Sequence, residues 1–181
     1  MEQLLMSRGD TKIKAEEIQF PDGYYMRPYN KAGKSTDGVG WCKCCIGGSL
    51  GIEELSENVF EEKMLKDKTV NPGNIFFLIS PAGDIAGTVT YQYADDEDTG
   101  YIHMVAIEKN HQGKRLAVPL MLYAVQKIIG DGKKKILLNT DDWRIPAIKT
   151  YLHTGFVPVI KDGDTDMENR WRKVYDIIGI K

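Results

Sequence analysis

Residues 101–117, YIHMVAIEKNHQGKRLA, run from an apolar strand through a basic turn into a helix. The alternation over residues 99–107 predicts the strand, and the apolar stripe over residues 116–129 predicts the helix. The first backbone N–H groups of a helix lack partners within it, and they lie at the positive end of its dipole. With Lys114 and Arg115 beside them, these N–H groups form a candidate anion site. These residues alone are equally consistent with a basic turn that is exposed to solvent and binds no anion.

The segments around this stretch predict one sheet. Two strand patterns precede it and are joined by a Pro-Ala-Gly turn, which makes an antiparallel meander with residues 99–107. A strand, a short helix and another strand follow it, as βαβ crossovers require. We therefore expect an α/β (mixed α+β) fold with one twisted mixed sheet and helices on both faces. The expected strands are residues 24–29, 75–80, 84–93, 99–107, 134–140 and 156–160, and the expected helices are residues 52–65, 116–129, 145–153 and 167–178.

Three parts are expected along the chain. Residues 1–20 are polar and mostly unpatterned, so they are interpreted as an N-terminal arm. Residues 21–160 form the main domain, and residues 161–181 a C-terminal helical extension packed on it. Residues 30–50, rich in Gly, Lys and Ser, are expected to be a long loop.

Composition excludes several classes of protein. The chain has 181 residues, 42% of them hydrophobic and 28% charged, with a formal net charge of -2, so neither a disordered chain nor a nucleic-acid or membrane-surface binder is expected. No apolar run has the length of a membrane span or of a signal-peptide core, and a cytoplasmic location is expected.

The three cysteines, Cys42, Cys44 and Cys45, form a single cluster that cannot build a disulfide framework. A reducing compartment suits them. A zinc site would need a fourth ligand and usually a second spaced pair, so no metal is predicted. A nucleophilic cysteine that carries an acyl group remains an alternative.

The turn at residues 112–117 resembles the pyrophosphate loop of the GNAT superfamily of acyl-CoA N-acyltransferases. The family pattern is Q/R-x-x-G-x-G/A between a strand and a helix. Gln112 matches its first position and Ala117 its last, and Gly113 and Lys114 are common between them. Arg115 replaces the middle glycine, a departure that restricts the freedom of the turn.

A second motif extends the resemblance. In residues 139–156, Ala147-Ile148, Tyr151 and Gly155-Phe156 fall in the register of the family's later motif. Arg144 stands where many members carry Asn. Two motifs in order, each in its expected setting, are more specific than either alone.

The resemblance implies acetyl-CoA as the cofactor, with its pantetheine between two splayed parallel strands, those that end at Ile107 and begin at Lys134. The backbone of Val105 and Ile107 would hold the pantetheine. The implied diphosphate ligands are the amides of Gln112, Gly113, Lys114, Arg115, Leu116 and Ala117.

The resemblance also names catalytic groups. The Val105 N–H would stabilise the negative charge that develops on the thioester oxygen. Tyr151 would protonate the departing thiolate, since a phenol retains its proton at neutral pH. His103 is a candidate base for the attacking amine, because it alternates with Tyr101, Val105 and Ile107 on one face of the strand. A packing tyrosine and a structural histidine are the alternatives.

The sequence thus predicts an N-acetyltransferase that moves acetyl from acetyl-CoA to a primary amine by direct attack in a ternary complex. The amine is on a small molecule or a peptide, and the enzyme is a monomer or a homodimer. The rival hypothesis, favoured by the departures at Arg115 and Arg144, is a non-catalytic CoA-binding or regulatory module with the same fold.

Overall fold

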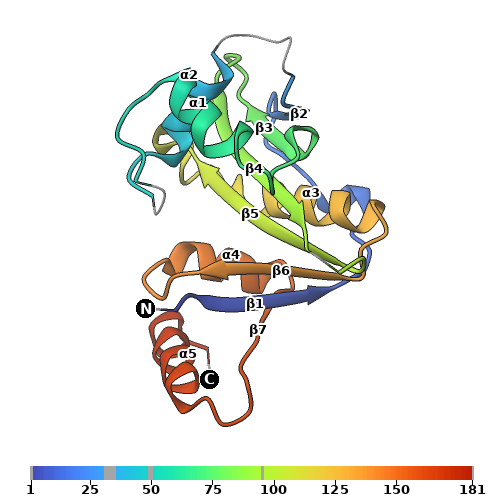
Figure 1. The fold of residues 1–181 in the computed structure, drawn as a ribbon, viewed down its shortest axis with the longest axis vertical. Coiled ribbons are helices and arrows are strands. Elements are labelled where there is room, and N and C mark those ends of the chain that lie inside the picture. Colours follow the sequence, from blue (N-terminus) through green and yellow to red (C-terminus); the bar gives the residue numbers. More distant parts are fainter. Residues whose placement is uncertain (1, 31–35, 49–50, 95, 181) are drawn as a thin grey trace.

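The computed structural model describes residues 2–30, 36–48, 51–94 and 96–180, and it is organised around one seven-stranded sheet (Figure 1). The strand order is β2-β3-β4-β5-β6-β1-β7. The strands are β1 (Leu4–Gly9), β2 (Tyr25–Pro28), β3 (Ile75–Ile79), β4 (Ile85–Tyr93), β5 (Thr99–Ile107), β6 (Lys135–Thr140) and β7 (Val157–Pro158). The helices are α1 (Asp37–Cys45), α2 (Glu57–Phe60) with a π-helical turn (Glu61–Leu65), α3 (Ala117–Gly130), α4 (Ile145–His153) and α5 (Thr165–Ile178). Short 3-10 turns lie at Ala15–Glu17, Pro72–Asn74 and Lys109–His111.

The sheet is mixed, as the sequence predicts. Strands β2 to β5 form an antiparallel meander, and β1 pairs antiparallel with both β6 and β7. Among the pairs in the described residues, β5 and β6 alone are parallel, and α3 makes the crossover between them. The prediction of one mixed sheet is therefore confirmed.

Helices cover both faces of the sheet (Figure 1). One core cluster joins β1, β3, β4, β5 and β6 to α3, α4 and α5, and a second joins α1 and α2 to β3. The side chains of β3 alternate between them, with Phe76 and Leu78 in the first and Phe77 in the second. The continuous apolar run of β3 is thus explained by burial on both sides.

A bulge in β5 separates the two middle strands. Thr90 of β4 pairs with Met104 and Tyr91 pairs with Ile102, so His103 is an extra residue on β5. The parallel pairing of β5 with β6 ends just before this residue, at Ile102 and Leu138. Beyond it the two strands diverge, and they open like a V in Figure 1. The expected splay of the parallel strands is present.

The bulge overturns one detail of the sequence analysis. Strict alternation placed Tyr101, His103, Val105 and Ile107 on one face of the strand. In the structure, Ile102 packs in the same core cluster as Val105 and Ile107. The alternation does not hold across His103, because the extra residue shifts the register of side chains by one.

The N-terminal segment is not an arm without structure. Residues 4–9 form β1 between β6 and β7, and the side chains of Leu4 and Met6 are fully buried. The third inward position is Arg8, whose guanidinium donates to the backbone carbonyls of Gly9, Thr11 and Thr154. A charged residue at an inward position broke the apolar alternation, so the sequence pattern missed the strand.

The long loop predicted over residues 30–50 is also wrong where the structure describes it, because α1 lies there. Its two glycines are weak helix formers. A Cβ at Gly40 would lie 2.5 Å from the Ile85 side chain, and one at Gly38 would lie 2.4 Å from the Glu57 carboxylate. The glycines therefore allow α1 to pack closely on β4 and α2, and this packing outweighs propensity.

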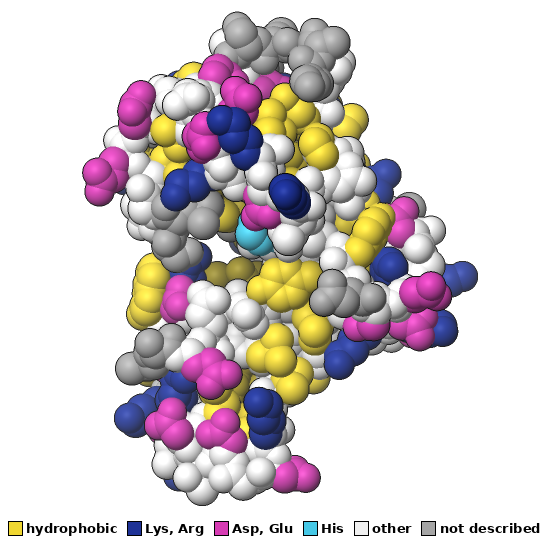
Figure 2. Space-filling view, in the orientation of Figure 1, with side chains coloured by type: hydrophobic (Ala, Val, Ile, Leu, Met, Phe, Trp, Pro, Cys, Tyr) yellow, Lys and Arg dark blue, Asp and Glu magenta, His cyan; other side chains and the backbone are white. Residues whose placement is uncertain are grey.

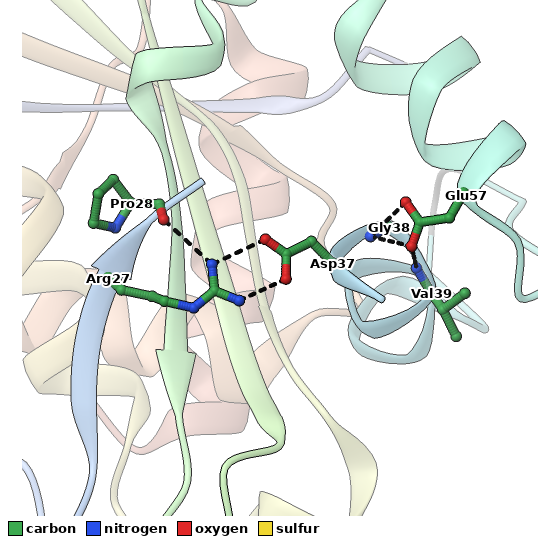
Figure 3. Close-up of polar contacts among 6 residues, drawn as sticks. All are labelled: Arg27, Pro28, Asp37, Gly38, Val39 and Glu57. Carbon is green, nitrogen blue, oxygen red and sulfur yellow. Dashed lines mark hydrogen bonds and ion pairs between the residues drawn. The ribbon is translucent and has the colours of Figure 1, made fainter. Parts of the chain in front are cut away.

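Two carboxylates hold α1 in place (Figure 3). Arg27 of β2 forms a two-pronged ion pair with Asp37, whose side chain is 3% exposed. The N–H groups of Gly38 and Val39, at the start of α1, donate to the Glu57 carboxylate of α2. The positive end of this helix is therefore already neutralised by the protein itself.

Most other elements differ from the prediction only at their ends, whereas the second half of the helix predicted over residues 52–65 is the π-helical turn. The helix predicted over residues 52–65 begins later, where the Ser56 side chain accepts the N–H of Val59 as an N-cap. The last helix begins earlier, capped by Asp164. None of the described helices combines the length and the apolar character that a membrane span requires.

Candidate functional site

Three contacts fix the turn between β5 and α3. The Glu108 carboxylate accepts the N–H of Asn110, and the Gln112 side chain donates to the carbonyl of Ile107 at 3.2 Å. His111 Nδ1 lies 2.9 Å from the hydroxyl of Tyr24, which precedes β2. Contacts within the turn, with the end of β5 and with Tyr24 therefore fix the backbone that precedes α3.

The next backbone amides are free. Within the described residues, the N–H groups of residues 113–116 donate to no backbone or side-chain acceptor, and the first bond that enters α3 from this turn is from Leu120 N to Leu116 O. Pro119, in the first turn of α3, has no N–H to satisfy. The free amides, the helix dipole and the exposed Lys114 and Arg115 are together the features of a candidate anion site. These residues thus fit a diphosphate.

Arg115 takes the conformation that suits a glycine. Its φ is +59°, and no other non-glycine among the described residues has a positive φ. L-residues pay roughly 1–2 kcal/mol in this left-handed region. The departure from the family pattern at this position therefore keeps the shape of the turn and adds strain.

We expect Arg115→Gly to raise the free energy of unfolding by about 0.5 kcal/mol, because the relief of strain exceeds the entropy that glycine adds to the unfolded chain. Urea denaturation measures this change. Arg115→Ala is the matched control: it removes the same charge but keeps the left-handed strain, so it should not stabilise. Equal stability changes for the two variants would contradict the strain.

Where β5 and β6 diverge, the edge of β5 that faces β6 has no partner strand among the described residues. Glu108 N bonds Ala86 O, so the antiparallel ladder directs the backbone groups of Ala106 and Met104 toward β4. Those of Val105 and Ile107 point to the other side, which β6 has left. The Ile107 carbonyl already accepts a hydrogen bond from the Gln112 side chain, whereas the Val105 N–H and C=O face the opening between β5 and β6. An extended amide-bearing chain fits this edge.

A cavity of about 250 Å³ lies where β5 and β6 part, and Figure 2 shows the surface hollowed between these two halves of the sheet. It brings together Val105, His103 and Tyr151, the three predicted catalytic residues. Its other lining residues are Gln3, Tyr101, Ile102, Met104, Leu138, Asn139, Thr140, Asp141 and Arg144. The turn at residues 112–117, which resembles the pyrophosphate loop, is separate from the cavity and lies past the end of β5.

The environment of Tyr151 keeps its phenol protonated. Burial raises its pKa, and the positive charge of Arg144 opposes this rise. The phenol therefore carries its proton at neutral pH and can supply it to a group in the cavity.

His103 is held in its neutral form. Burial is the main effect and lowers the pKa of the imidazole, while the negative charge of Asp67 raises it in part. A neutral imidazole at pH 7 can accept a proton. The weaker candidates Glu53 and Glu54 do not line the cavity, and Asp142 is held by Arg170 at 2.9 Å.

Several residues that line the cavity or lie near it were not found by sequence reasoning. Thr140 and Asp141 carry no motif of their own, and only the end of a buried strand followed by a helix start signalled a site there. Arg144 was noticed only as a departure from a pattern. Asp67, which lies near His103, follows the π-helical turn, whose packing the sequence does not reveal.

A larger groove, of about 1090 Å³, lies between β2, α1 and the start of the turn after β5. None of the predicted catalytic residues lines it. His111 and Lys109 line it, so it borders the back of the turn. Size alone therefore does not locate the chemistry.

The cysteines lie in the second core cluster. Burial raises the pKa of Cys44 to about 12 and raises that of Cys45 as well. These thiols are therefore poor nucleophiles at neutral pH. No group of three His, Cys, Asp or Glu side chains in the described parts of the chain is arranged to hold a metal ion.

Comparison with known proteins adds a decisive match. Residues 48–156 match the model of the "Acetyltransferase (GNAT) family", which covers more than half of the chain. The chain belongs to the GNAT acetyltransferase family. The superfamily expected from the two motifs is thus confirmed.

Solved structures share the GNAT fold. A GCN5-related N-acetyltransferase from Sphaerobacter thermophilus superposes with a TM-score of 0.61 at 15% identity, over 88% of this chain and 50% of that one. A tandem GNAT protein from the clavulanic acid biosynthesis pathway gives 0.62 at 14%, over 87% and 50%. A chain of the NatC complex bound to Gag peptide and CoA gives 0.59 at 19%, over 76% and 86%. The chain spans about half the length of the first structures it matches. No curated protein matches it.

Proposed function

We propose that this GNAT protein transfers an acetyl group from acetyl-CoA to a primary amine. The observation that carries the proposal is the alignment of two features along β5. The free amides of residues 113–116 suit a diphosphate, and the unpaired Val105 edge leads from there into the cavity with Tyr151. A coenzyme A molecule bound along this path would bring its thioester to the cavity.

The proposed chemistry is direct attack in a ternary complex. The Val105 N–H polarises the thioester carbonyl, and His103 accepts the proton of the attacking ammonium, directly or through water. Tyr151 donates a proton to the thiolate as it leaves, and the second proton that the attacking nitrogen loses returns the phenolate to the phenol, directly or through water. The C–S bond breaks as the C–N bond forms, so the products are the amide and coenzyme A.

The test is thiol release from acetyl-CoA with a panel of primary amines. The proposal expects release that depends on the amine and yields one amide for each thiol. Tight coenzyme A binding without amine-dependent release would favour the non-catalytic module instead. The strain at Arg115 does not favour that module, because the turn keeps its free amides.

His103 gives a pH prediction. Because burial holds its pKa below the reference of about 6.5, kcat should fall only when the pH drops below that value. In Asp67→Asn the charge that raises the pKa is gone, so the acid limb should move to lower pH. A kcat profile over pH 4–9 measures both. A limb that persists unchanged in His103→Gln would exclude His103 as the base.

A further inference from the structure

Two of the residues that line the cavity with Tyr151 carry buried polar atoms that lack partners. Seven buried side-chain nitrogen or oxygen atoms in the described residues have no hydrogen-bond partner. Three of the seven, Thr140 Oγ1, Arg144 Nε and Arg144 Nη2, belong to residues that line this one cavity. Native proteins leave few such atoms, and each one costs stability. Their concentration at the reactive end of the splay points to a ligand that completes them.

The two residues lie where the fold delivers them to the cavity. Thr140 ends β6, past the last pair with β5, and its side chain is almost fully buried. Arg144 is the N-cap residue of α4. The end of the strand and the start of the helix therefore bring both residues to the cavity that Tyr151 also lines.

The charge of Arg144 is only partly neutralised. Its Nε lies 3.0 Å from Asp141 Oδ2, but this ion pair does not have the geometry of a hydrogen bond. Asp141 also accepts a hydrogen bond from Gln3. Among the described residues that line the cavity, Arg144 is the one lysine or arginine. A quarter of its side chain remains exposed, so a ligand can approach the guanidinium, and to reach the buried Nε and Nη2 it must displace the atoms that cover them.

We propose that Thr140 and Arg144 form a subsite for a carboxylate carried by a substrate. A guanidinium matches the two oxygens of a carboxylate better than it matches a single acceptor, and the hydroxyl adds a third donor. The inference rests on the proposed function and names its substrate class. The carboxylate belongs either to the acceptor, as in an amino acid, or to the acyl group, as in a dicarboxylic acyl-CoA.

The first arm of the test compares acceptors. Amines are paired with counterparts that carry a carboxylate, such as ethylamine with alanine and cadaverine with lysine, and kcat/KM is measured with acetyl-CoA. If the acceptor carries the carboxylate, the ratio within each pair should favour the carboxylate-bearing amine by about tenfold or more, as a charged hydrogen bond provides. Arg144→Gln should abolish the preference and Thr140→Val should reduce it. The two amines of a pair differ in basicity, but this difference is the same for every variant. It therefore cancels when the ratio of kcat/KM is compared between the wild type and a variant.

The second arm compares acyl groups. Calorimetry gives the affinities of the protein for succinyl-CoA and for acetyl-CoA, and also the affinity of the CoA-saturated protein for alanine and for ethylamine. If succinyl-CoA binds more tightly than acetyl-CoA, the acyl group carries the carboxylate; if alanine binds more tightly than ethylamine, the acceptor carries it. In either case the difference should disappear in Arg144→Gln. Lys149→Gln, which removes an exposed positive charge from the same helix, should keep the preference. Circular dichroism verifies that each variant folds.

The outcomes separate this inference from the proposed function. Turnover of both amines of every pair at equal kcat/KM, with equal binding of succinyl-CoA and acetyl-CoA, overturns the carboxylate subsite and leaves the transferase standing. A preference that survives in Arg144→Gln overturns it too. A calorimetric preference that depends on Arg144, without thiol release from any amine, supports the subsite and rejects the transferase.

Discussion

Replacement of Tyr151 by phenylalanine is expected to lower kcat about 100-fold, the usual scale for the loss of a general acid. The ring stays, so its contact with Phe156 and the shape of the cavity are preserved. The hydroxyl alone is lost, and the thiolate must then leave without a proton from the protein. Steady-state kinetics with a reactive amine measures the effect.

The control for this variant is the affinity for coenzyme A. Calorimetry should give a Kd within about twofold of the wild-type value, because the diphosphate amides and the Val105 edge are untouched. Tyr101→Phe removes another hydroxyl from the same cavity and should leave most of the activity. A Tyr151→Phe enzyme with full kcat would show that Tyr151 is a packing residue.

The second large effect concerns the anchor of α1. Arg27→Met should lower the free energy of unfolding by about 3 kcal/mol, because it leaves the buried carboxylate of Asp37 without its partner. Arg27 also stacks 5.2 Å from the centre of the Phe77 ring, and methionine retains part of that contact. Urea denaturation gives the difference between the variant and the wild type.

The double variant Arg27→Met/Asp37→Leu tests the cause. If an unpaired buried charge is the main cost, removal of the second charge should restore most of the stability. A double variant as unstable as Arg27→Met would instead assign the loss to packing. A single variant that loses under about 1 kcal/mol would show that the ion pair behaves as an exposed one.

The sequence predicted the elements whose residues obey simple periods. The meander, α3 and α4 all have regular apolar patterns, and burial on one or both faces of a sheet imposes such patterns. The two motifs led to the family and to the cavity that holds Tyr151 and Val105. These residues could be found because each motif is made of residues that are close together in the sequence.

The parts that sequence reasoning missed depend on distant partners. β1 was missed because a charged residue, Arg8, occupies an inward position, where it donates to two nearby carbonyls and to the distant carbonyl of Thr154. α1 was hidden because its glycines serve contacts with β4 and α2. The bulge at His103 inserts one residue against β4, which no period in β5 itself reveals. Thr140 and Arg144 meet only where two elements end.

The free amides of residues 113–116 should bind the diphosphate of coenzyme A. Amide hydrogen exchange with and without coenzyme A tests it most directly, because an amide that gains an acceptor exchanges more slowly. We expect strong protection at these residues on binding, while the amides at the far end of α3, residues 127–130, change little. Saturated binding with unchanged exchange at residues 113–116 would contradict it.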